Sequence, residues 1–193
     1  MCLQQALRLL AGSGAEAGHL PRALRYNLAI SAIHAGRPHE ALPLLQALAA
    51  EAAAVGNHRL LADVLNATGS AFDALGRLAE AEAATRAGLA EAWQRLETEN
   101  ALYGLWNLGL LALRQGRPER AAHLLGFADG FWRRQFGALN AEDRRDVLRA
   151  RRRCRRELGR GTGQRCWNDG AALPLAAAVA LALDDAAASP GSA

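Results

Sequence analysis

The strongest constraint on the fold of this chain is a Gly-Arg pair that recurs every forty residues, starting at Gly36, Gly76 and Gly116. An alanine follows each glycine five residues later, at Ala41, Ala81 and Ala121. Self-similarity at a fixed period of this size is typical of proteins built from stacked repeats. A plain helical bundle would carry three such copies in phase only by chance. The pattern therefore favours a function in binding partners over a function in catalysis.

Each repeat has the sequence pattern of two helices joined by a short turn. Before the third glycine, apolar residues recur at intervals of three and four, as a helix with one buried stripe requires. The glycine is suited to end that helix because it tolerates a left-handed conformation. Pro38 and Pro118 follow two residues after their glycines, a position that the first turn of a new helix accepts. The sequence thus predicts a helix, a Gly-Arg turn and a second helix in each repeat.

This pattern resembles the tetratricopeptide repeat over residues 22–137. The usual repeat has about 34 residues, so a period of forty implies helices that are longer by roughly one and a half turns in total. The resemblance implies an all-α fold, a right-handed superhelical stack of helix-turn-helix repeats. The matching positions are a small residue, an apolar residue, the turn glycine and the later alanine: Ala29, Gly69, Gly109; Ala32, Phe72, Ala112; Gly36, Gly76, Gly116; Ala41, Ala81, Ala121.

The two ends of the chain depart from the repeat. Residues 1–17 are interpreted as the second helix of a truncated repeat, which suggests a piece of a longer protein. Residues 138–185 are interpreted as a helical cap, with a helix from about 141 to 158, a loop at Gly161-Thr162-Gly163, a short helix at 164–169 and a last helix that reaches about Asp184. Residues 186–193 carry serine, proline and glycine and are expected to be disordered.

The segment from Trp167 to Leu175, which reads Trp-x-x-Gly-x-Ala-Leu-Pro-Leu, supports a second resemblance. It is similar to the C-terminal region of large bacterial signal-transduction ATPases and transcriptional regulators, in which repeats follow an ATPase domain. The resemblance implies that this chain is the scaffold or sensor arm of such a regulator. Its partners would be a protein or peptide, or the missing N-terminal domains of the same polypeptide.

Composition narrows the remaining classes. The longest apolar stretch is too short to cross a membrane, and the N-terminus lacks a secretory pattern, so we expect a cytoplasmic protein without a membrane partner. Cys2, Cys154 and Cys166 lack metal-ligand spacing and are interpreted as free thiols. All 23 basic residues are arginine. Residues 133–165 hold twelve of them and four acids, so this segment carries +8 whereas the rest of the chain carries −4.

The arginines of residues 144–156 form a candidate surface for phosphate or an acidic partner. Arg145, Arg149, Arg152 and Arg156 share one helix face, while Val147, Cys154 and Leu158 could form a narrow buried stripe. Arginine pairs with phosphate through two hydrogen bonds, so nucleic-acid binding is one alternative. The segment lacks interleaved aromatics and a DNA-reading motif. The other alternative is a solvated helix, or one that docks on an acidic face of missing domains.

A second candidate surface is the groove that the first helices of the repeats would line. Asparagine can bond the backbone of an extended peptide, and aromatic residues and arginine are common anchors. The alternative is that the asparagines cap or cross-link helices and that Trp106 belongs to the core. A small-molecule sensor that uses the same groove is a further possibility. The predicted groove residues are Tyr26, Asn27, Asn66, Tyr103, Trp106, Asn107 and Arg114.

Enzyme chemistry has little support in the sequence. The five histidines are scattered and do not form the i, i+4 pair of a zinc site. The glycine-rich stretch at residues 159–163 lacks the lysine of a phosphate-binding loop. We therefore expect no catalytic residues, no metal and no cofactor. The sequence predicts a non-catalytic protein–protein interaction scaffold or sensor arm of a bacterial signalling or transcriptional regulator.

Overall fold

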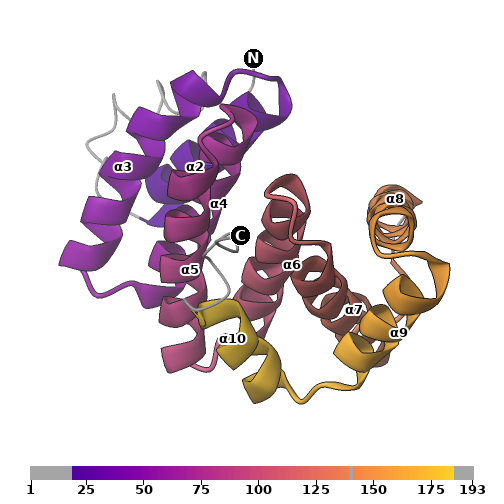
Figure 1. Ribbon diagram of the computed structural model, residues 1–193. Coiled ribbons are helices and arrows are strands. Elements are labelled where there is room, and N and C mark those ends of the chain that lie inside the picture. Colours follow the sequence, from indigo (N-terminus) through magenta and orange to yellow (C-terminus); the bar gives the residue numbers. More distant parts are fainter. Residues whose placement is uncertain (1–18, 140, 185–193) are drawn as a thin grey trace. The chain divides into compact units, whose positions relative to one another are not determined.

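The computed structural model describes residues 19–139 and 141–184, and within them all regular structure is α-helical (Figure 1). The helices are α2 (His19–His34), α3 (Pro38–Ala54), α4 (His58–Ala74), α5 (Leu78–Gln94), α6 (Thr98–Arg114), α7 (Pro118–Gln135), α8 (Ala141–Glu157), α9 (Arg160–Ala172) and α10 (Leu175–Leu183). The prediction of an all-α fold is confirmed. The truncated repeat at residues 1–17 and the tail at residues 186–193 lie outside the described part.

The same turn joins the helices from α2 to α7. At the first turn, the amide of Gly36 donates to the carbonyl of Ile33 at 3.0 Å, and the amide of Arg37 donates to that of Ala32 at 2.8 Å. This pair of bonds is the Schellman motif, which requires a left-handed residue between the helices. The same two bonds recur at residues 56–57, 76–77, 96–97 and 116–117.

The recurrence of this motif shows that the forty-residue period contains two equal steps of helix and turn. Left-handed residues occur at Gly36, Gly56, Gly76, Leu96 and Gly116, with φ between 58° and 75°. The role expected for the three Gly-Arg pairs is confirmed. The alternate turns, at Gly56 and Leu96, lack the Gly-Arg pair that marks the other three, and the second lacks a glycine as well.

Leu96 is expected to be a weak point of this series. Its φ is 58°, so its backbone carries the strain of a left-handed conformation. The residue is 81% exposed, so burial of its side chain offsets little of that strain. Replacing Leu96 with glycine should raise the free energy of unfolding by about 1 kcal/mol. Urea titration followed by circular dichroism measures the change. The matched control is Gly56→Leu, which should lower stability at the equivalent turn; equal stability of both variants and the parent would contradict the assignment.

Small residues bring paired helices close together, as the repeat pattern predicts. A Cβ added to Gly69 in α4 would lie 2.0 Å from Thr85 Oγ1 and 3.0 Å from the Ala81 carbonyl oxygen, both in α5. A Cβ added to Gly109 in α6 would lie 2.6 Å from Leu125 Cγ in α7. The expected close approach at both glycines is therefore confirmed.

The contacts divide the chain into two compact units between Glu91 and Ala92. In the first unit, α3 packs on both α2 and α4. The fully buried residues of its apolar cluster are Ala29, Ala41, Leu45, Leu48, Val64 and Ala71. Leu42 and Leu44 of α3 are only partly buried and pack at the edge of this cluster.

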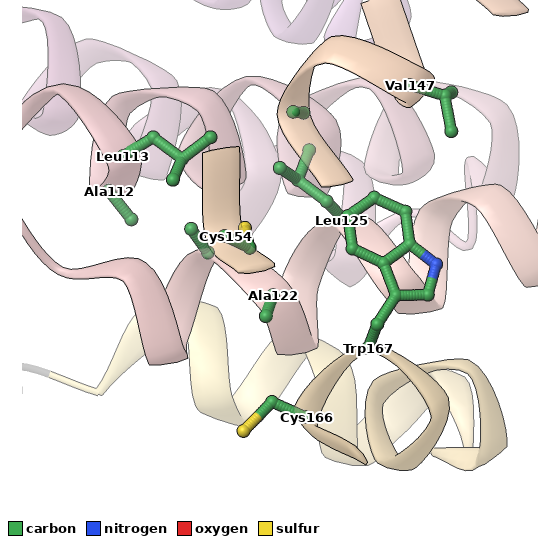
Figure 2. Packing of buried hydrophobic residues seen from close by; sticks show 10 residues of the cluster. Ala112, Leu113, Ala122, Leu125, Val147, Cys154, Cys166 and Trp167 are labelled. Carbon is green, nitrogen blue, oxygen red and sulfur yellow. The ribbon is translucent and has the colours of Figure 1, made fainter. Parts of the chain in front are cut away.

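In the second unit, α7 is the helix on which α6, α8, α9 and α10 pack. Figure 2 shows its apolar cluster, in which Trp167 of α9 and Val147 and Cys154 of α8 meet residues of α6 and α7. Two glycines allow α7 and α9 to touch through their backbones. A Cβ on Gly126 would lie 2.2 Å from the carbonyl oxygen of Trp167, and one on Gly170 would lie 2.1 Å from that of His123.

The loop expected at Gly161-Thr162-Gly163 is wrong, because these residues belong to the first turns of α9. The chain reverses direction just before α9, at Gly159, whose φ is 80°. Gly163 is buried, and a Cβ there would lie 2.8 Å from Cα of Arg155 in α8. Gly163 thus allows α8 and α9 to pack closely. In the sequence, a glycine with this role cannot be distinguished from a glycine in a loop.

The helix expected at 164–169 is the middle of α9. The helix predicted to run from 141 to 158 and the last helix are present as α8 and α10.

Candidate partner-binding sites

The second unit carries an apolar pocket with aromatic walls. Its volume is about 70 Å³, and its lining comes from α6, α7 and the segment after α7: Leu102, Tyr103, Trp106, Ala128, Asp129, Trp132 and Leu139. The rings of Tyr103 and Trp132 are 6.0 Å apart at an angle of 66°. Phe136, which is 51% exposed, continues the aromatic surface at 4.8 Å from the Trp132 ring. We call this site the aromatic pocket.

The helical spacing of these residues explains why they gather. Tyr103 and Trp106 are three residues apart on α6, and Trp132 and Phe136 are four apart on α7, so each pair shares a helix face. Asp129 lies one turn before Trp132 and is only 7% exposed. Its Oδ1 accepts a hydrogen bond from Nε of Arg133 at 2.6 Å. A carboxylate therefore lies among the rings with one of its oxygens engaged.

The first unit carries a more polar pocket of about 210 Å³. Asn57, in its lining, has a structural task as well, because its side-chain oxygen accepts the amide of Leu60 at 3.1 Å and caps α4. The lining comes from α2 and from the beginning of α4: Arg22, Ala23, Tyr26, Asn27, Asn57, Arg59, Leu60 and Asp63. We call this site the polar pocket.

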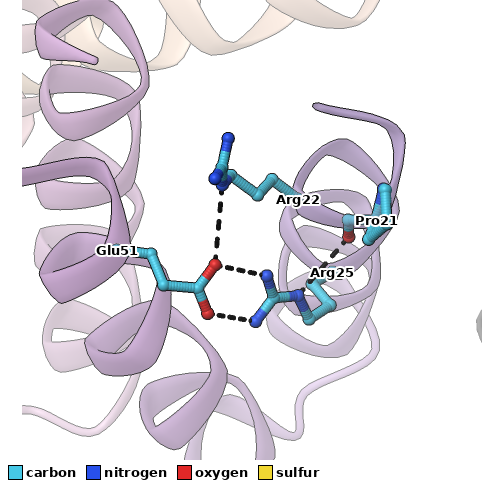
Figure 3. Close-up of polar contacts among 4 residues, drawn as sticks. All are labelled: Pro21, Arg22, Arg25 and Glu51. Carbon is cyan, nitrogen blue, oxygen red and sulfur yellow. Dashed lines mark hydrogen bonds and ion pairs between the residues drawn. The ribbon is translucent and has the colours of Figure 1, made fainter. Parts of the chain in front are cut away.

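An ion-pair cluster ties α2 to α3 in the same unit (Figure 3). Arg25 donates from both terminal nitrogens to Glu51, at 2.6 Å to each carboxylate oxygen. Nε of Arg22 lies 3.6 Å from Oε2 of the same carboxylate. The hydrogen bonds from Arg25, opposed by desolvation, hold the pKa of Glu51 below its ordinary value. Glu51 therefore stays ionised and acts as a link between the helices.

Four of the seven predicted groove residues line one of the two pockets described above. Tyr26 and Asn27 line the polar pocket, and Tyr103 and Trp106 line the aromatic pocket. Three others, Asn66, Asn107 and Arg114, line neither of these pockets. Sequence reasoning missed Asp129 and Trp132 because it selected residues from the first helix of each repeat only. The aromatic spacing on α7 was the available signal.

The arginines of α8 divide between surface and interior. Arg145, Arg149, Arg152 and Arg156 are exposed, and the buried stripe expected opposite them is present, with Leu158 partly buried. Arg149 pairs with Asp146 at 3.0 Å. Among the side chains that the structure describes, no carboxylate pairs with Arg145, Arg152 or Arg156. We call these four exposed residues the arginine face.

Two other arginines of α8 hold the fold together. Arg153 donates to the backbone carbonyl of Leu113 in α6 at 2.8 Å. Arg151 donates to Oε1 of Gln164 in α9 at 2.8 Å, and its guanidinium lies 5.7 Å from the centre of the Trp167 ring. The arginine-rich composition of this helix thus serves helix packing as well as the surface.

The thiols of Cys154 and Cys166 are buried in the apolar cluster of Figure 2 and are not bonded to each other. Burial, with the charge of Glu157 adding to it, raises the pKa of Cys154 from 9.0 to about 11. Burial also raises the pKa of Cys166. Both thiols are therefore protonated and unreactive at neutral pH.

The raised pKa of Cys154 predicts a loss of stability at high pH. As pH rises, the thiol ionises first in the unfolded chain. Its contribution to the free energy of unfolding is therefore complete below pH 9 and is lost as pH approaches 11. We expect this group to lower the free energy of unfolding by about 2 kcal/mol across that window. Urea titrations at pH 8, 9, 10 and 11 measure the slope. The Cys154→Ala variant is the control and should lack the loss of stability that ionisation of this thiol causes. Identical slopes of the free energy of unfolding against pH in the two proteins would contradict the prediction.

The residues that the structure describes offer neither a metal site nor a single membrane-spanning helix. Their histidine, cysteine, aspartate and glutamate side chains form no cluster of three or more that could hold a metal ion. None of the described helices is, on its own, long and apolar enough to span a membrane; α9 and α10 meet that test only together, with a bend of 119° between them. No protein-family model, curated protein or solved structure matches the chain.

Proposed function

We propose that this chain is a non-catalytic protein-interaction module that binds a peptide segment of its partner through the aromatic pocket. The observation that carries the proposal is the exposed aromatic surface around a pocket with an apolar lining. Tyr103 is 46% exposed and Phe136 is 51% exposed, although large aromatic side chains are usually covered. Exposed apolar surface of this kind, next to a cavity, is where partner side chains anchor.

We further propose that the hairpins α2–α3, α4–α5 and α6–α7 are tetratricopeptide-like repeats that stack in a right-handed superhelix. Identical turns and small residues at matched positions support this proposal. Repeat arrays of this type present extended surfaces for partners. The resemblance of the segment around Trp167 favours a role as the scaffold or sensor arm of a bacterial signalling or transcriptional regulator in the cytoplasm. In that setting the partner is another protein or another domain of the same polypeptide.

The test is a selection of random peptides displayed on phage against the purified chain. The selected peptides are then measured by fluorescence anisotropy against two variants, Trp132→Ala and Val55→Ala. Loss of an anchor residue costs about 2 kcal/mol, so Trp132→Ala should weaken binding roughly 30-fold. Val55 is an exposed apolar residue of the first unit, and its variant should bind like the parent. Peptides that bind both variants equally, or a selection without enrichment, would overturn the proposal.

Nucleic-acid binding through the arginine face is the second candidate function. The supporting observation is that Arg145, Arg152 and Arg156 are exposed on one helix face and have no carboxylate partner among the described residues. Such an array can pair with successive phosphates. If the four residues of the face each contact one phosphate, the slope of log K against log salt should be about −4 for duplex DNA.

Anisotropy with labelled 20-mer duplex DNA and single-stranded RNA, at several salt concentrations, tests this candidate. The variant Arg152→Gln/Arg156→Gln should reduce the salt slope by about half. The matched control is Arg37→Gln/Arg77→Gln, which removes two exposed arginines from the turns of the first unit. No binding at low salt, or equal effects of the two variants, would remove this candidate.

A further inference from the structure

We propose that the aromatic pocket is a cage for an N-methylated ammonium group, carried by a dimethylated lysine of the partner peptide. This inference rests on the proposed function and names the chemistry of the anchor. The combination that carries it is three aromatic side chains, Tyr103, Trp106 and Trp132, around a cavity in which, among the described lining residues, the one carboxylate is that of the buried Asp129.

The ring faces favour a cation. The face of an aromatic ring carries negative charge density, and tryptophan binds cations more strongly than the other aromatic residues. Two of the lining rings, those of Tyr103 and Trp132, contact each other edge to face with their centres 6.0 Å apart, so they form one continuous aromatic wall of the pocket. Trp106 adds a third aromatic side chain to the lining.

Asp129 adds charge complementarity inside the pocket. Arg133 engages Oδ1, whereas Oδ2 has no partner in the part of the chain that the structure describes. The Asp129 side chain is 9% exposed while that of Arg133 is 54% exposed. The positive partner is therefore largely in solvent, where its charge is screened, and the negative group is next to the cavity.

The number of hydrogen-bond donors distinguishes among cations. A guanidinium has five N–H donors and a lysine ammonium has three, and each needs an acceptor when buried. Among the carboxylate oxygens of the lining, Oδ2 of Asp129 is the open one; the Tyr103 hydroxyl can donate or accept, and the indole nitrogens are donors. A dimethylammonium group has a single N–H, which matches the single open oxygen, and its methyl groups match the rings.

The size of the pocket agrees with this occupant. A cavity needs a volume of roughly 10–15 Å³, measured in the same way, to hold one water molecule. A pocket of about 70 Å³ therefore accommodates about five non-hydrogen atoms. A dimethylammonium nitrogen, its two methyl groups and the last two methylenes of the lysine side chain are five atoms.

Calorimetry and NMR on the intact chain test the inference. Three peptides of one Gly/Ser sequence carry dimethyl-lysine, lysine or the uncharged isostere with carbon in place of nitrogen. The first should bind at least tenfold more tightly than the other two. It should shift the indole signals of Trp106 and Trp132, and not those of Trp93 and Trp167. Tetramethylammonium chloride, compared with sodium chloride, should shift the same two signals.

Charge variants supply a readout that a merely structural role would not move. Asp129→Asn should weaken binding of the dimethyl-lysine peptide about tenfold and leave the isostere unchanged. Arg133→Gln removes the neighbouring positive charge and should strengthen binding of the same peptide. Circular dichroism confirms that both variants are folded.

The outcomes separate the inference from the proposed function. Equal binding of the isostere would overturn the cation cage and leave a pocket for an apolar anchor. Binding of tetramethylammonium without discrimination among the peptides would overturn the peptide source in favour of a free quaternary ammonium compound. If displayed peptides bind in a Trp132-dependent way and the dimethyl-lysine peptide does not, the inference fails and the proposed function stands.

Discussion

Replacing Gly170 with alanine is expected to lower the free energy of unfolding by about 3 kcal/mol, a large share of the stability of a domain of this size. The added Cβ would lie 2.1 Å from the carbonyl oxygen of His123 and 2.6 Å from its Cα. These are backbone atoms of α7, so they cannot turn away as a side chain can. Helix α9 would have to move off α7, and this movement would open the cluster around Trp167. Urea titration followed by circular dichroism measures the loss.

Gly161→Ala is the matched control for this prediction because it makes the same change in the same helix. A Cβ at Gly161 would lie 3.6 Å from a terminal nitrogen of Arg165, an ordinary contact with the end of a flexible side chain. The better helix propensity of alanine should leave stability unchanged or raise it by up to about 1 kcal/mol. Two variants of equal stability would show that α9 does not approach α7 as closely as the structure has it.

Replacing Gly69 with alanine is expected to cost a similar amount, about 3 kcal/mol, in the first unit. The new Cβ would meet Thr85 Oγ1 at 2.0 Å and the carbonyl oxygen of Ala81 at 3.0 Å. Thr85 is fully buried, and its hydroxyl donates to the Ala81 carbonyl at 2.8 Å. The hydroxyl is therefore confined between the two helices and has little room to move away.

A double-mutant cycle identifies the source of this cost. Thr85→Ala removes the hydroxyl that the new Cβ would strike, so Gly69→Ala should be less damaging in that background by at least about 1 kcal/mol. Calorimetric melting of the parent, both single variants and the double variant gives the coupling energy. Strict additivity would show that the two side chains do not meet and would refute the packing of α4 on α5.

Local chemistry explains why much of the fold could be predicted from the residues. A helix that ends in a Schellman turn needs a left-handed residue, and glycine adopts that conformation at the smallest cost. The pairs at Gly36, Gly76 and Gly116 therefore marked three turns without any knowledge of the packing. Similarly, Gly69 and Gly109 indicated close helix pairs because two in-phase positions lacked side chains. The strandless, helical character of the described residues followed from these signals.

Other features depend on which helices meet. Leu96 occupies a left-handed position that no local preference predicts, because the hydrogen bonds of its turn and the flanking helices hold it there. Gly163 was interpreted as part of a loop, since a glycine that permits close packing cannot be told from a flexible one without its neighbour. Arg151 and Arg153 belonged to a charged run in the sequence, and only their partners on other helices set them apart from the arginine face.

The candidate site shows the same division most clearly. Tyr103 and Trp106 could be selected from the sequence as aromatic residues of a first helix, although Trp106 is half-buried against the apolar cluster. Asp129 and Trp132 join them only because α6 and α7 pack side by side, which brings residues 26 positions apart (129 − 103 and 132 − 106) around one cavity. Periodicity and turn chemistry act between near neighbours in the chain, so the residues alone predicted the helical character and the helix ends at Gly36, Gly76 and Gly116. The pocket, the buried carboxylate and the division of the arginines arise from contacts across helices, and these were decided by tertiary packing.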